Sequence, residues 1–143
     1  MNKPAQYAPS VRLTSSNVEA TLKCNLDTRD YFSSTLAKGN GLLSYPVATI
    51  TADEIILAGG NVNEKNEKFY LNATLNYWTM TPSQYQASAA YSTVLHMDAS
   101  GKIYLWDYVS HKIGIRPVIN LSSDVLISSG DGTTENPFQL KLS

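Results

Sequence analysis

The chain has 143 residues, 43% of them hydrophobic, so it is the size of one ordinary domain and too apolar for a disordered protein. Only 16% of the residues are charged and the net charge is −1, so the composition does not favour nucleic-acid binding, which needs clustered Lys and Arg. The single cysteine, Cys24, excludes an intrachain disulfide and a multi-cysteine zinc site, and no apolar run is long enough for membrane insertion.

Serine, threonine, asparagine and tyrosine take the place of the missing charges. Such a surface is typical of secreted or cell-surface modules, and we expect one of these locations. Residues 1–10 contain two prolines and no periodic pattern, which predicts a flexible lead-in to a single domain over residues 11–143. The lead-in resembles a linker, so we expect the natural chain to extend further upstream.

The first expected elements are short. Residues 11–17 are expected to form a strand, residues 29–35 a short helix or an irregular stretch, and residues 38–41 a glycine-containing turn. Residues 42–50 are expected to be extended and interrupted at Pro46.

The clearest local pattern predicts a helix of about two turns that begins at Thr51. Thr51 is a good N-cap and Glu54 lies three residues later, which is the arrangement of a capping box. Asp53 and Glu54 also lie in the first turn, where they favour the positive end of the helix dipole. Gly59 and Gly60 predict its end.

A sheet is expected to follow. Residues 61–68 form a polar loop, the expected place for mobility, and residues 77–82 form an aromatic strand that ends at Pro82. Residues 91–97 and 102–109 alternate as strands around the turn at residues 98–101, which predicts a hairpin.

The C-terminal part is expected to complete this sheet. Residues 112–121 are expected to add a third strand, and a turn at residues 130–132 leads to a last strand near residues 138–142. The fold class is therefore α+β, with one or two short helices and a mainly antiparallel sheet.

Two runs together give the chain a resemblance to a known family: YWTMTP at residues 77–82 and GIRPV at residues 114–118. With the capped helix and the hairpin, they resemble uncharacterised bacterial surface-protein domains, often from Gram-positive bacteria. Those domains are similar to the formylglycine-generating-enzyme-like (sulfatase-modifying-factor) branch of the C-type-lectin-like fold. The resemblance runs from about Leu42 onward and is strongest in the last quarter of the chain.

The resemblance implies a structural role for the arginine of the GIRPV run. Arg116 would be the buried donor of an ion pair that anchors the core, and Pro117 would confine the strand to an edge. A buried guanidinium needs a partner, and Asp53 and Glu54 are the candidates, Glu54 less so if it completes the capping box.

The chain departs from the family at the positions that carry chemistry. Members that oxidise cysteine need paired cysteines, so the resemblance implies no catalytic residue here. The calcium site of the lectins is built around Glu-Pro-Asn, whereas the order here is Glu135, Asn136, Pro137. We therefore expect no metal and no cofactor, and Asp131 is expected to serve a turn rather than a calcium ion.

The candidate binding residues lie in the second strand of the hairpin. Alternation predicts that Tyr104, Trp106 and Tyr108 share one face, while the aliphatic residues Ile103, Leu105 and Val109 lean toward the other. If the aliphatic face is buried, the aromatic face is a recognition surface. The alternative, that Trp106 belongs to the core, stays open.

We therefore expect a non-enzymatic surface module that binds or displays, with a protein or glycan partner that contacts the aromatic face and the loops at residues 61–68 and 83–90. The globular head of a pilin-like or fibre subunit is the alternative. A hydrolase with Ser110, His111 and Asp107, or a metal site from His96, His111 and a carboxylate, is less favoured because nearby polar residues on adjacent strands are common by chance.

Overall fold

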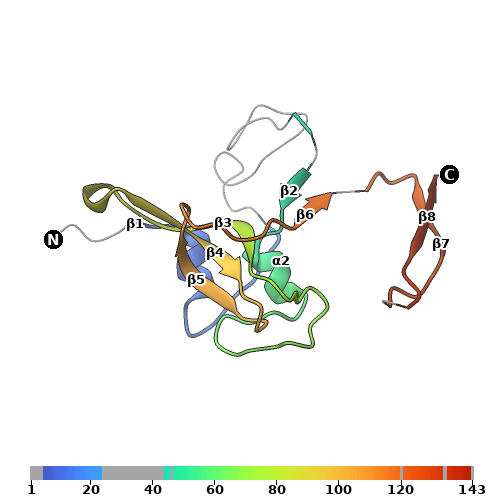
Figure 1. Ribbon diagram of the computed structural model, residues 1–143, viewed down its shortest axis with the longest axis horizontal. Helices are drawn as coiled ribbons and strands as arrows, with labels where there is room; N and C mark the ends of the chain where they lie inside the picture. The colour runs from blue at the N-terminus through green and yellow to red at the C-terminus, as the bar shows by residue number, and fades with distance from the viewer. Residues whose placement is uncertain (1–4, 24–43, 46, 120, 134, 143) are drawn as a thin grey trace.

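In the part of the chain that the structure describes, antiparallel sheets and two short α-helices form an α+β fold, which agrees with the predicted α+β class. The computed structural model describes residues 5–23, 44–45, 47–119, 121–133 and 135–142 (Figure 1). The main sheet has the strand order β1-β3-β4-β5, and all its neighbouring strands run antiparallel. Its strands are β1 (Ala5–Gln6), β3 (Tyr77–Gln86), β4 (Tyr91–Met97) and β5 (Ile103–Tyr108), with the 3-10 turn η1 (Ala87–Ala89) between β3 and β4.

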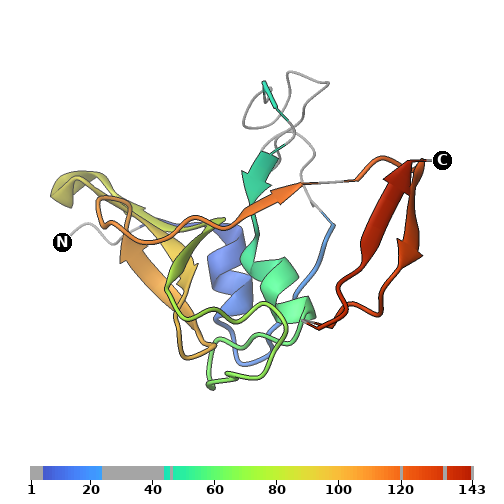
Figure 2. The ribbon, with the colours of Figure 1, turned by 45° about the vertical axis from the view of Figure 1, so that its right-hand side comes forward.

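The helices α1 (Ala8–Leu13) and α2 (Ala52–Leu57) lie side by side against this sheet (Figure 2). The capping box is present: the Thr51 hydroxyl accepts from the Glu54 amide at 3.1 Å, and the Glu54 carboxylate accepts from the Thr51 amide at 2.8 Å. The core between helices and sheet contains Leu13, Ile50, Ala52, Ile55, Val62, Phe69, Tyr77, Leu95, Met97 and Ile103.

The main sheet curls strongly. The Ser83 hydroxyl on β3 donates to the Leu105 carbonyl on β5 at 2.7 Å, although β4 lies between these two strands. Ser83 also contacts the hydroxyl of Ser10 on α1 at 3.2 Å, so buried hydroxyls join the helix to the concave side. These groups are buried at little cost because each has a hydrogen-bond partner.

The N-terminal prediction was wrong for the described residues 5–17. Ala5–Gln6 pairs with β3, and residues 8–13 form α1 where a lead-in and a strand were expected. Pro9 lies in the first turn of α1, where a missing N–H costs no helical hydrogen bond. Leu13 is fully buried, so packing against β3 rather than local propensity fixes this helix.

Pro82 does not end its strand, as the sequence predicted, because β3 runs on to Gln86. The pairing with β4 shifts register on both sides of Pro82. A residue without an N–H is tolerated at such an irregularity, so the strand passes through it. Half of the expected loop at residues 83–90 is therefore strand, and only η1 and Ala90 form the turn.

The hairpin of β4 and β5 is confirmed, but residues 112–121 do not add a third strand to it. Of the described residues in this range, β6 (Pro117–Ile119) forms a strand, and it pairs with β2 (Val47–Thr49) in a separate two-stranded sheet. The chain reaches β2 by passing the first residues of β3, where the Trp78 amide donates to the Gly114 carbonyl at 2.9 Å. A side chain at Gly114 would come within 2.8 Å of the Asn76 carbonyl oxygen, so glycine permits this crossing.

The tail forms its own hairpin from β7 (Val125–Ser129) and β8 (Gln139–Leu142). The turn predicted at residues 130–132 is present, with positive φ at Gly130 and Gly132. Figures 1 and 2 both place this hairpin on the far side of the molecule from the main sheet.

The loop at residues 61–68 is fastened to the β4–β5 hairpin. The Asn61 carbonyl accepts from the Ile103 amide at 2.8 Å, and Val62 is buried in the core. The predictions for residues 29–35 and 38–41, together with Cys24, Leu42, Leu43 and Pro46, lie outside the described residues.

Candidate functional site

Strand β5 buries its first aliphatic residue and exposes its three aromatic side chains, as the sequence predicted. Ile103 is fully buried, whereas Tyr104, Trp106 and Tyr108 are 44%, 50% and 40% exposed. Trp106 is therefore not a core residue. Val109 does not join the aliphatic side, because β5 ends at Tyr108 and Val109 is exposed. We call Tyr104, Trp106 and Tyr108 the aromatic face.

A register shift between β4 and β5 changes how this face is built. Tyr104 pairs with His96, but Asp107 rather than Trp106 pairs with Val94. Opposed residues lie on the same side of a sheet, as do residues two apart on one strand. The shift therefore brings Asp107 to the side of His96 and Tyr104, where plain alternation would have placed it in the core. It also turns Tyr108, which pairs with the buried Thr93, to the other side of the strand from Tyr104.

The aromatic rings form two groups. The first runs across the sheet from Trp78 to His96, Tyr104 and Trp106, with successive ring centroids 6.1, 5.0 and 6.1 Å apart. The second joins Tyr108 to Tyr91 and His111 at 5.5 and 5.6 Å. Edge-to-face and offset contacts at these distances stabilise the rings and hold them in place.

Asp107 links the two groups of rings. Its Oδ2 lies 3.3 Å from Nδ1 of His96, and its Oδ1 is in close contact with Nδ1 of His111. His96 is buried, whereas the His111 side chain is 54% exposed. The contact with His96 does not have hydrogen-bond geometry, so within the described residues the buried Nδ1 of His96 has no hydrogen-bond partner.

Burial lowers the pKa of His96 below its ordinary value, because a buried site disfavours the imidazolium. The carboxylates of Asp107 and Asp98 act in the opposite direction but do not outweigh burial, and His111 lowers the pKa further. His96 is therefore neutral at neutral pH.

The structure brings together two of the three residues considered for a hydrolase. His111 and Asp107 are in contact, as a general base and its orienting carboxylate would be. Ser110 is exposed and makes no hydrogen bond to either residue in the part of the chain that the structure describes. His96 also lies beside this pair, as the less favoured hypothesis that grouped it with His111 and a carboxylate required, and the register shift accounts for that position.

The predicted partners of Arg116 are wrong. Asp53 binds Arg12 instead, through contacts of 2.5 and 3.0 Å, and Glu54 is held by the capping box. Arg116 is partly buried, donates to the Leu71 carbonyl at 2.5 Å and lies 5.5 Å from the centre of the Tyr77 ring. The Leu71 carbonyl and the face of the Tyr77 ring thus stabilise the guanidinium in place of a carboxylate.

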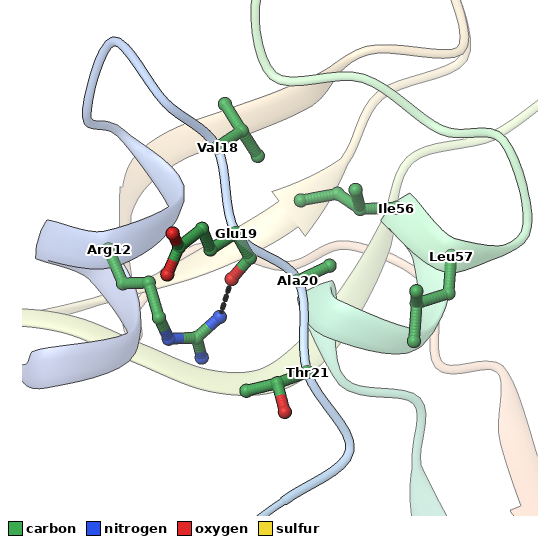
Figure 3. A pocket seen from close by; sticks show the side chains of 7 residues that line it. All are labelled: Arg12, Val18, Glu19, Ala20, Thr21, Ile56 and Leu57. Atoms are coloured by element: carbon green, nitrogen blue, oxygen red, sulfur yellow. Dashed lines mark hydrogen bonds between the residues drawn. The ribbon is translucent and has the colours of Figure 1, made fainter.

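A hollow of about 600 Å³ lies between α1 and α2 and is lined by Arg12, Val18, Glu19, Ala20, Thr21, Ile56 and Leu57 (Figure 3). Its one guanidinium is already engaged, since Arg12 binds both the Asp53 carboxylate and the Glu19 carbonyl. Thr21 also donates its amide to Asp53 at 2.8 Å. The polar groups here serve to hold residues 19–21 against the helices.

Asp131 serves a turn, as predicted. Its Oδ1 accepts from the Thr133 amide at 3.0 Å and from the Thr133 hydroxyl at 2.8 Å. Within the described ranges, no three His, Cys, Asp or Glu side chains form a metal-ligand set as they stand.

The comparisons with known proteins found no matching family model, no matching curated protein and no matching solved structure. Among the described residues, neither helix has the length and apolar character that crossing a bilayer requires.

Proposed function

We propose that the chain is a non-enzymatic binding or display module at the cell surface or in the secreted space, with a C-type-lectin-like fold. Its partner is a protein or a glycan that contacts the aromatic face. The observation that carries this proposal is the exposure of Tyr104, Trp106 and Tyr108 on one strand at the edge of the main sheet.

The physical support is that these rings are both exposed and held in place. Tyrosine and tryptophan offer a large contact area with few rotatable bonds, so they lose little entropy on binding. The opposite side of β5 is anchored by the fully buried Ile103, and the rings contact one another or the neighbouring strand β4. The turn at η1 and the loop at residues 61–68 are candidate additional contacts.

A binding screen with paired variants tests this proposal. The protein is presented to arrayed free oligosaccharides and to a displayed peptide library, and dissociation constants are measured for whatever binds. The double variant Y104A/W106A is expected to weaken binding about 30-fold or more, since even one central aromatic anchor contributes about 2 kcal/mol. Y70A is the matched control, because Tyr70 is 78% exposed but lies outside the aromatic face. Equal binding by the wild type and Y104A/W106A would contradict the proposal.

A structural subunit of a fibre is the second candidate, and the C-terminal hairpin favours it. Val125 opposes Leu142 and Ile127 opposes Leu140, so four apolar side chains share one side of the hairpin. Ile127, Leu140 and Leu142 are at least half exposed. Isolated two-stranded hairpins are marginal in water, so packing against a neighbouring subunit would stabilise this one.

The two sides of the hairpin allow a controlled test of this candidate. Sedimentation velocity would compare the wild type with I127K, on the apolar side, and L126K, on the opposite side next to Lys141. A fibre subunit should self-associate as wild type and as L126K but not as I127K. Monomers for all three proteins across the concentration range would exclude assembly through this surface.

A further inference from the structure

A carboxylate lies among the exposed rings on the convex side of the main sheet. Tyr104 pairs with His96, and Asp107 lies on the same side of β5, which faces away from the helices. The Trp106 ring lies 6.1 Å from the Tyr104 ring, and both side chains are exposed. We call Tyr104, Trp106 and Asp107 the acidic aromatic patch.

The Asp107 carboxylate is held in one orientation and keeps one oxygen available. Its Oδ1 accepts from the Tyr108 amide at 2.9 Å and is in contact with His111. Its Oδ2 accepts no hydrogen bond from the described residues, and they do not fully enclose it. A carboxylate oxygen that is fixed in place and lacks a donor is a ready acceptor for an N–H group of a ligand.

No lysine or arginine pairs with this carboxylate in the part of the chain that the structure describes. Its ion-pair contacts are with two imidazoles, and an imidazole is a cation only when it is protonated. His96 is neutral at neutral pH, because burial lowers its pKa. Lys102 and Lys112 are the nearest lysines in the sequence, and neither forms an ion pair with Asp107. The patch therefore places a negative charge beside ring faces, which also attract cations.

Building on the proposed binding function, we propose that the acidic aromatic patch binds an arginine side chain of a protein partner. The guanidinium donates to Oδ2 of Asp107 and lies against the ring of Tyr104 or Trp106. A cation within about 6 Å of the centre of such a ring is attracted to its face. Both parts of the patch thus act on the same charged group.

An arginine matches this patch better than a neutral sugar or a lysine does. A neutral sugar leaves the negative charge of Asp107 unbalanced, whereas a guanidinium balances it through a charge-assisted hydrogen bond. Its planar group also stacks on a ring while it donates, which a lysine ammonium does not do. The patch is convex, since α1 and the buried hydroxyls occupy the concave side (Figure 2). Convex surfaces suit protein partners, in whose interfaces arginine is enriched, rather than enclosed small molecules.

Matched peptide pools test the proposal. Blocked heptapeptides carry a central arginine or its neutral isostere citrulline, with random uncharged residues on both sides. The Trp106 indole N–H signal of the labelled protein reports the apparent dissociation constant of each pool. We expect the arginine pool to bind about tenfold more tightly than the citrulline pool at about 0.05 M NaCl, and most of this preference to be lost at about 0.5 M NaCl.

Variants assign the preference to the patch. D107N should bind the two pools equally, with the citrulline pool as in the wild type, and D124N, at an exposed carboxylate outside the patch, should keep the preference. Y104A/W106A should weaken binding of both pools. The comparison of pools and of salt concentrations on the wild type remains decisive if D107N does not fold.

Three results would overturn the proposal. Equal binding of the two pools by the wild type, with both weakened in Y104A/W106A, would leave the proposed binding function standing without a charged ligand. Tighter binding of neutral oligosaccharides than of the arginine pool at Trp106 would assign the patch to glycans. An arginine pool that binds Y104A/W106A as tightly as the wild type would contradict both the patch and the proposed function.

Discussion

Asp53 shows how long-range packing selects the partner of a charged residue. Its carboxylate lies in the first turn of α2, and it binds Arg12 of α1 rather than Arg116. It also accepts the Thr21 amide, so it joins α1, α2 and the segment after α1. The sequence could not predict this pair, because residues 11–17 read as a strand, and only the packing of Leu13 against β3 makes them a helix.

A double-mutant cycle checks this assignment. D53A should lower the free energy of unfolding by about 2–3 kcal/mol, because it leaves the partly buried Arg12 without its carboxylate. Urea denaturation should then show a coupling energy of about 1 kcal/mol or more between D53A and R12A, and almost none between D53A and R116A. Strong coupling between Asp53 and Arg116 would restore the original hypothesis.

His96 should make stability depend on pH. Because burial lowers its pKa in the folded state, the unfolded state binds the proton more tightly. Its contribution to stability is therefore complete above the unfolded pKa of about 6.5 and is lost as the pH falls toward the lower folded value.

The measurement is urea denaturation between pH 8 and pH 5. The wild type should lose up to about 1.4 kcal/mol per pH unit in this window, the limit for one proton. H96Q should show a flatter profile, and H111Q serves as the matched histidine variant. A profile in H96Q as steep as that of the wild type would show that another group is responsible.

At the scale of elements, local patterns were reliable where neighbours in sequence decide the structure. The capping box at Thr51, the turn at residues 98–101 and the exposed aromatic side of β5 depend on residues within a few positions of each other. Strand pairing was not reliable. Residues 112–121 were expected beside β5, but β6 pairs with β2 some seventy residues earlier, and nothing in the local pattern specifies that partner.

Gly101 ties two of these elements together. It has φ of +79°, and a side chain there would come within 2.1 Å of the Asn66 carbonyl oxygen. The turn of the β4–β5 hairpin is therefore packed directly on the loop at residues 61–68. That contact explains why the loop is fastened where its composition suggested mobility.

G101A should therefore lower the free energy of unfolding by about 3 kcal/mol or more, since it combines backbone strain with a backbone clash. G59A is the matched control. Gly59 also has positive φ, +103°, but a side chain there would meet only Phe69 Cβ at 3.6 Å, so strain alone should cost about 1–2 kcal/mol. If thermal or urea denaturation showed that G101A and G59A lower the free energy of unfolding equally, the loop at residues 61–68 would not pack on the turn.

At the scale of the whole molecule, the fold class followed from composition and periodicity, but the arrangement of the sheets did not. The passage of Gly114 across the start of β3 and the register shifts in the β3–β4 and β4–β5 pairings depend on residues far apart in the sequence. The candidate site, too, could be predicted from the sequence only in part. Alternation alone predicted the exposed rings, whereas the shift in β5 placed Asp107 beside His96.

The result is a curled sheet with helices on its concave side and aromatic rings exposed on its last strand. The pairing with β4, the hydrogen bond from Ser83 on β3 and the fully buried Ile103 hold that strand, so the rings are presented on a firm support. Such an arrangement suits recognition of a partner, which is the central claim.

The most direct test of that claim is an NMR titration of the labelled protein with a ligand recovered from the binding screen. The chain has two tryptophans, so it gives two indole N–H signals that report on Trp78 and Trp106 separately. The account predicts that the Trp106 signal and the amides of β5 shift on binding, while the amides of α1 and α2 stay in place. Shifts confined to the helices or to the C-terminal hairpin, with Trp106 unmoved, would contradict it.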